Sequence, residues 1–116
     1  MERDAIIDAI RDELHVAALS RGNGNEGRAR VCARRAAGLA VGWYAQQHGW
    51  DLTESNAYRR LLWLQSQMGV SEDLRQAAQR LTTRVTLDHQ LPHPEDPLQD
   101  AELLISGMGL DLTGSQ

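Results

Sequence analysis

Apolar residues recur at every third or fourth position along most of this 116-residue chain, and this period restricts its fold more than any other feature. No segment shows the alternation of β-branched and polar residues that is typical of a half-buried strand. We therefore expect an all-α protein without a sheet. A chain of this length supports one hydrophobic core, so we expect a single helical domain over residues 1–116.

Apolar stripes and capping residues predict four or five helices. The first covers about residues 2–20, with a stripe of Ile6, Ile10, Leu14 and Ala18, and a flexible glycine-rich turn over 21–27 follows it. The second covers about 26–48 and contains Gly38 and Gly42. Because an interior glycine costs a helix roughly 1 kcal/mol relative to alanine, these two predict a close helix contact, within the subunit or across a dimer.

The remaining helices are placed by their boundaries. The third begins between 51 and 55, presents Tyr58, Leu61, Leu62, Gln65 and Met68, and ends at Gly69. The fourth begins at the N-cap Ser71 and carries apolar positions as far as Val85, and the fifth follows Asp96 and Pro97. Gly107 and Gly109 end it, and a frayed tail is expected over 109–116. Helices with short connections predict an antiparallel four- to five-helix bundle.

Composition excludes several classes of protein. The net charge of −4 argues against broad capture of nucleic acid, and the absence of a long uncharged apolar run argues against a membrane span. The charged amino-terminal segment does not resemble a signal peptide, and Cys32 has no second cysteine to pair with. We therefore expect a cytoplasmic protein. All twelve basic residues are arginines, which codon bias in a GC-rich genome explains more simply than phosphate recognition.

Conventional catalytic and cofactor motifs are missing. Gly22, Gly24 and Gly27 have the G-x-G-x-x-G spacing of a dinucleotide site, but they follow a helix instead of a strand, so an ordinary connector is the better interpretation. The four histidines lack the spacing of a metal site, and only His89 and His93, beside a proline-rich loop, allow a weak one. We expect neither a cofactor nor a metal.

One pair of residues suggests chemistry. Arg84 and His89, in RVTLDH, lie at the end of the fourth helix, just before the proline-rich loop. Such a pair supports RNA cleavage without metal, because an imidazole moves protons near neutral pH and a guanidinium stabilises charge on phosphorus. The alternative is that Arg84 complements a helix dipole and His89 is a loop residue. Further candidates for contacts in the same groove are His93, Arg80 and Trp50, of which Trp50 is the tryptophan expected to be exposed.

Three segments resemble the HEPN family, over about residues 27–108. VCARRAAGLAVGWYAQQHG is similar to the second HEPN helix, NAYRRLLWLQSQMGVSEDLRQAAQRLTTRV to the third and fourth, and DPLQDAELLI to the start of the last helix. The resemblance implies a small helical bundle, commonly a homodimer. Members are RNases with an R-x4-6-H motif or partners of minimal nucleotidyltransferases, and Arg84 and His89 match the motif positions.

Three functions remain open at this stage. The first is a homodimeric, HEPN-like partner or binding protein in a nucleotide- or RNA-linked system, with a nucleotidyltransferase, an antitoxin or RNA as its partner. The second is a metal-independent RNase that uses Arg84 and His89. The third is a structural adaptor dimer without a ligand, which predicts a flat apolar surface instead of a basic groove.

Overall fold

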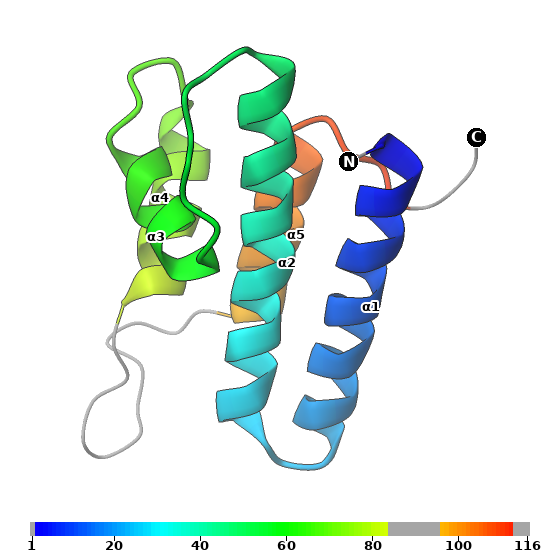
Figure 1. Ribbon diagram of the computed structural model, residues 1–116. Coiled ribbons are helices and arrows are strands. Elements are labelled where there is room, and N and C mark those ends of the chain that lie inside the picture. Colours follow the sequence, from blue (N-terminus) through cyan, green and yellow to red (C-terminus); the bar gives the residue numbers. More distant parts are fainter. Residues whose placement is uncertain (1, 84–95, 113–116) are drawn as a thin grey trace.

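The computed structural model describes residues 2–83 and 96–112 of the chain (Figure 1). These residues form five α-helices and no strand: α1 (Arg3–Gly22), α2 (Glu26–Gln47), α3 (Ala57–Gln65), α4 (Glu72–Thr82) and α5 (Pro97–Gly107). The prediction of an all-α helical bundle is therefore confirmed. No helix in the described part of the chain is both long enough and apolar enough to cross a bilayer.

Helix α2 is the central element of the bundle. It contacts each of the other four helices, and Figure 1 shows it between α1 on one side and α3 and α4 on the other. Its buried face is built from alanines, of which Ala33, Ala36, Ala37 and Ala40 are fully buried. Small side chains on this face let four neighbours approach one helix closely. The larger core residues come mainly from those neighbours, among them Ile10, Leu61, Leu81 and Leu104.

The predicted apolar stripes are only partly correct. In α1, Ile6 and Ile10 are buried, but Ala18 is exposed and Ala17 is buried in its place. Each residue turns the helix by about 100°, so a stripe repeated strictly every four residues drifts away from the core. In α5 the buried residues Ala101, Leu104 and Ile105 follow helical spacing, and Met108, directly after the helix, is also buried.

The third helix differs most from its prediction. It begins at Ala57, after residues 51–56, which form no helix, and its buried side chains are Leu61 and Leu64. Tyr58 and Leu62 are exposed, and Met68, beyond the end of the helix, is 96% exposed. Asn56 caps α3 by accepting a hydrogen bond from the Arg59 amide at 3.0 Å.

The connection between the first two helices is shorter than the turn predicted over 21–27, because helix occupies both of its ends. α1 continues to Gly22 and α2 begins at Glu26, which leaves only residues 23–25 between them. The side chain of Asn25 accepts a hydrogen bond from the Arg28 amide at 3.0 Å and so caps α2. Arg21 pairs with Glu26 at 2.6 Å across the connection.

Residues 109–112, the described part of the segment predicted as a frayed tail, contact the bundle. Leu110 is buried, and Leu112 packs against the core. Arg11 of α1 donates two hydrogen bonds to the carbonyl oxygen of Leu112, at 3.1 and 2.6 Å. These contacts fix residues 109–112 on the bundle, and residues 113–116 lie outside the described part.

Candidate anion-binding cleft

The pair predicted to cleave RNA, Arg84 and His89, lies outside the described residues, as does His93. The structure does describe the helix end that precedes them. Arg30 of α2 donates hydrogen bonds to the carbonyl oxygens of Arg80 at 2.6 Å and Thr83 at 2.8 Å. Arg34 donates to the carbonyl oxygen of Leu81 at 2.6 Å. The two guanidinium groups therefore cap the C-terminal end of α4, where a positive charge complements the helix dipole.

The other two predicted groove residues have contacts within the bundle. Arg80 forms an ion pair with Asp100 of α5 at 2.8 Å. Trp50 is partly buried, not exposed as expected. It packs against Tyr44 and Trp63, with ring centroids 5.6 and 5.7 Å away. The loop that carries Trp50 places its ring against these aromatic groups, which sequence position alone does not indicate.

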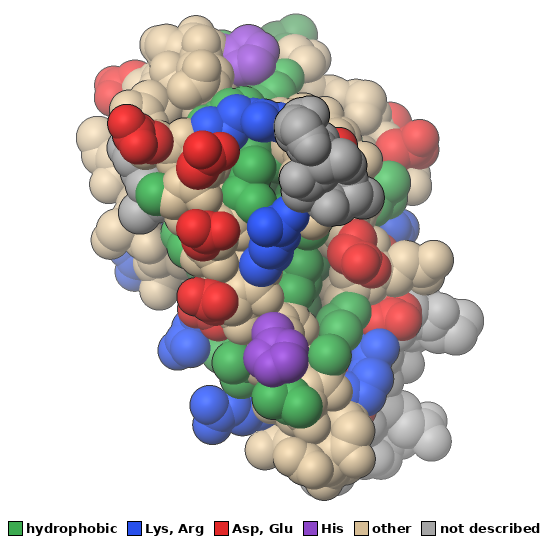
Figure 2. Space-filling model, turned by 90° about the vertical axis from the view of Figure 1, so that its right-hand side faces the viewer, with side chains coloured by type: hydrophobic (Ala, Val, Ile, Leu, Met, Phe, Trp, Pro, Cys, Tyr) green, Lys and Arg blue, Asp and Glu red, His purple; other side chains and the backbone are tan. Residues whose placement is uncertain are grey.

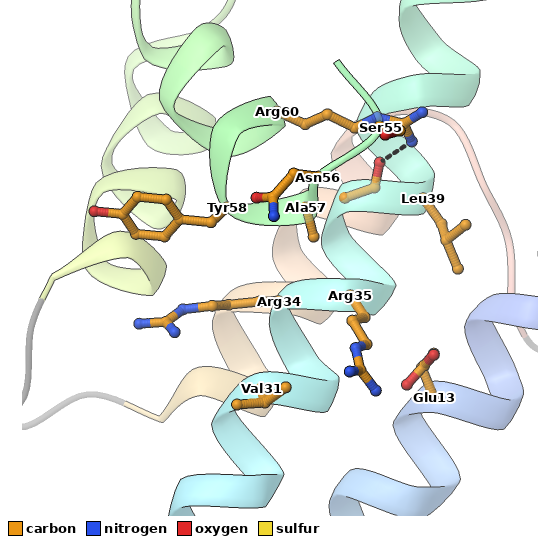
Figure 3. Close-up of a pocket in the computed structure, with 11 residues that line it drawn as sticks. Glu13, Val31, Arg34, Arg35, Leu39, Ser55, Asn56, Ala57, Tyr58 and Arg60 are labelled. Atoms are coloured by element: carbon orange, nitrogen blue, oxygen red, sulfur yellow. Dashed lines mark hydrogen bonds between the residues drawn. The ribbon is translucent and has the colours of Figure 1, made fainter.

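A cleft of about 430 Å³ lies where the start of α3 approaches α2 (Figure 3). α1 contributes Glu13 to its lining, α2 contributes five residues around Arg34 and Arg35, and the segment from Ser55 to Arg60 forms the remaining wall. Three arginines line the cleft, namely Arg34, Arg35 and Arg60, and Glu13 is the carboxylate among the lining residues.

Two glycines on α2 explain why the segment from Ser55 to Arg60 lies so close to this helix. A Cβ atom on Gly38 would lie 2.7 Å from the Cβ of Ala57, and one on Gly42 would overlap the guanidinium of Arg60. The close contact predicted from these two glycines is therefore present within the subunit. Arg60 then fixes the segment before α3, because its Nε donates to the Glu54 carbonyl at 2.7 Å and its Nη1 to the Gly38 carbonyl at 3.0 Å.

The arginines keep donors available for a ligand. A guanidinium carries five N–H groups, and Arg60 uses its Nε and Nη1 while Arg34 uses its Nε. Arg35 is exposed, and in Figure 3 its side chain extends toward the α1 side of the cleft. Within residues 2–83 and 96–112, no carboxylate lies in ion-pair distance of these three arginines.

The environment of Arg34 disfavours its positive charge. Burial lowers its pKa, and the positive charge of Arg30 lowers it further, while Tyr58 acts in the opposite direction. The Arg34 guanidinium carbon lies 5.6 Å from the centroid of the Tyr58 ring. An anion in the cleft would relieve the repulsion between the two arginines, since an opposite charge stabilises a partly buried cation.

This arrangement is suited to binding. Arginine recognises phosphate and carboxylate groups through paired N–H donors, and the described residues that line the cleft include no histidine. The described residues contain no group of three or more histidine, cysteine, aspartate and glutamate side chains that could hold a metal ion.

The sequence did not identify this cleft. Arg34 and Arg35 lie on α2, and Arg60 follows about 25 residues later on another helix, so only packing brings them together. The one signal was the pair Gly38 and Gly42, which predicts close approach but does not say which element approaches.

Comparison with protein-family models, curated proteins and solved structures finds no match for this chain. The resemblance to the HEPN family therefore stays a prediction. The function is inferred from the residues of the cleft.

Proposed function

We propose that this protein is the binding component of a nucleotide- or RNA-linked system and that it recognises phosphate groups in the cleft between α2 and the start of α3. One observation carries the proposal: among the described residues that line the cleft, three are arginines with available N–H donors and one, Glu13, is a carboxylate. Guanidinium groups bind phosphate oxygens in pairs, and they do so most strongly where water is partly excluded.

Size and charge distribution support the same function. The cleft volume of about 430 Å³ lies within the range of small-ligand sites. The chain as a whole carries a net charge of −4, so the arginine-lined cleft differs from its surroundings. On the α1 side, shown in Figure 2, acidic side chains gather in a row, and Asp4, Asp8 and Asp12 of α1 are exposed at four-residue spacing. An anionic ligand is repelled by this row and attracted by the arginines of the cleft.

The proposed function also includes an oligomeric state and a partner protein. As a HEPN-like protein, the chain forms a homodimer and associates with a nucleotidyltransferase or an antitoxin. Light scattering on the purified protein tests the first step, and we expect twice the 12.9 kDa subunit mass. A mass equal to one subunit across micromolar concentrations contradicts the homodimer.

Charge reversal in the cleft tests phosphate binding. We expect Arg35→Glu to weaken binding of a fluorescent RNA oligonucleotide or a nucleoside triphosphate by about tenfold or more, because a charged hydrogen bond is replaced by repulsion. Arg59→Glu is the matched control, since Arg59 is exposed, lies next to Arg60 and does not line the cleft. It changes the net charge equally and leaves the affinity within about twofold.

Fluorescence anisotropy at two salt concentrations measures both effects. Added salt weakens binding by the wild type, because phosphate contacts release counterions. Equal losses in the two variants, or no binding of either probe by the wild type, would remove the basis of the proposal.

RNA cleavage by Arg84 and His89 is the alternative, and both residues lie outside the described part of the chain. Incubation of a mixed RNA pool with the wild type and with His89→Ala tests it: cleavage by the wild type alone supports a nuclease, while equal cleavage or none contradicts it. The adaptor function predicts a flat apolar surface, and the arginine-lined cleft supports ligand binding instead.

A further inference from the structure

A second cavity continues the arginine-lined cleft along α2. It has a volume of about 250 Å³ and is lined by Ile6 of α1, Arg60, and four residues of α2. Leu39 and Arg60 line both cavities, so the two adjoin. Together they form one groove, called here the α2 groove, which extends from Val31 to Gln46. The fifteen helical steps between these two residues span about 22 Å.

One face of α2 forms the floor of this groove. Its residues follow helical spacing and are Arg35, Leu39, Gly42, Trp43 and Gln46. The absence of a side chain at Gly42 leaves room for the guanidinium of Arg60, which lies between the two cavities. A cation therefore lies midway along the groove as well as at the Arg35 end.

An aromatic side chain lies in each cavity. Tyr58 is 38% exposed and lines the first cavity, where Arg34 approaches its ring. Trp43 lines the second cavity and is partly buried. The order along the groove is thus aromatic, cationic, aromatic.

This order matches the chemistry of single-stranded nucleic acid. Proteins bind such strands by stacking unpaired bases on aromatic rings and by contacting the backbone with cations. A free nucleotide occupies only one cavity, whereas a strand of about four nucleotides reaches both, at the lower end of known site sizes. A duplex keeps its bases stacked on one another, so it offers none to the rings.

From these observations we infer that the α2 groove binds a short segment of single-stranded nucleic acid, with one base on Tyr58, another on Trp43 and the connecting phosphates on Arg35 and Arg60. This inference rests on the proposed function and names its ligand class. It also requires that affinity increase with strand length until both cavities are filled.

Substitution of Tyr58 tests the stacking contact. We expect Tyr58→Leu to weaken binding of a labelled eight-nucleotide RNA by about five- to tenfold and Tyr58→Phe to retain it, because only the ring is needed. Inorganic triphosphate, used as an unlabelled competitor, has no base to stack, so Tyr58→Leu should lower its affinity by a smaller factor than that of the RNA. Because Tyr58 is exposed, thermal unfolding of the three proteins should coincide.

A charge at the far end of the groove tests its length. Gln46 lines the second cavity, while its neighbour Gln47 is exposed and lines neither. We expect Gln46→Glu to weaken binding of the eight-nucleotide RNA about fivefold and to leave binding of a dinucleotide unchanged. Gln47→Glu has the same net charge and should bind both as the wild type does.

The outcomes separate this inference from the proposed function. If Arg35→Glu weakens binding of triphosphate but Tyr58→Leu and Gln46→Glu leave RNA binding unchanged, the strand is rejected and the phosphate cleft stands. If the wild type binds neither triphosphate nor RNA, both fail. Equal binding of a duplex of the same sequence, or displacement of the RNA by polyglutamate at the same concentration of charges, also overturns the inference.

Discussion

At the scale of single residues, Gly38 has the largest effect on the shape of the cleft. It is buried on α2, and the backbone of Ala57 lies directly against it. Glycine in a helix interior lowers the stability of the helix by about 1 kcal/mol relative to alanine. Here the missing side chain lets the start of α3 lie on α2, and the cleft wall follows from that contact.

We predict that Gly38→Ala destabilises the protein by about 1–3 kcal/mol, as overpacking of a core does. The new methyl group would lie 2.7 Å from the Ala57 Cβ and 2.8 Å from its Cα, and the backbone must shift to accommodate it. Urea denaturation followed by circular dichroism measures the loss.

Gly27→Ala is the control for this prediction, because it lies in the same helix and a Cβ there would meet only the Asn25 side chain, at 3.8 Å. It should stabilise the protein by about 0.5–1 kcal/mol through helix propensity. If Gly38→Ala gains stability in the same way, the contact with Ala57 is not as close as described.

At the scale of helices, α4 and α5 are joined by a charged contact. Asp100, in the first turn of α5, has a side chain only 8% exposed, and its Oδ1 accepts hydrogen bonds from Nε and Nη2 of Arg80 at 3.0 and 2.8 Å. A carboxylate near a helix N-terminus also complements the helix dipole. Asp100 therefore stabilises both the start of α5 and its packing on α4.

Loss of this carboxylate should weaken the bundle. We predict that Asp100→Ala lowers the free energy of unfolding by about 2–3 kcal/mol, because it removes two hydrogen bonds between charged groups and the carboxylate at the start of α5. Glu102→Ala, on the exposed side of the same helix, should change it by less than about 0.5 kcal/mol. Equal unfolding midpoints for the two variants, measured by urea titration, contradict a stabilising role.

Helix boundaries were predicted correctly where a capping residue in the sequence fixes them. Asp96 accepts hydrogen bonds from the amides of Leu98 and Gln99, with Pro97 between, so α5 begins where predicted. The start of α3 was not predicted correctly, because residues 51–56 form no helix. The start of α3 packs on α2 instead, where Ala57 lies against Gly38 and Arg60 donates a hydrogen bond to the Gly38 carbonyl, and no local pattern reveals these tertiary contacts.

At the scale of the whole molecule, the period of the apolar residues was enough to predict an all-α bundle, because each stripe needs a neighbouring helix to cover it. The cleft was not predictable in the same way. Arg34 and Arg35 resemble ordinary helix-surface arginines until Gly38 and Gly42 bring Arg60 across from them. The predicted pair Arg84 and His89 stays a prediction, since it lies outside the described residues.

Nuclear magnetic resonance of the arginine side chains tests the phosphate-binding cleft most directly. We predict that adding a short single-stranded RNA to ¹⁵N-labelled protein shifts the Nε–H signals of Arg34, Arg35 and Arg60, while those of Arg59 and Arg75 stay in place. Shifts at Arg59 and Arg75 with none at the three cleft arginines, or no shifts at any arginine under saturating RNA, would contradict phosphate binding in this cleft.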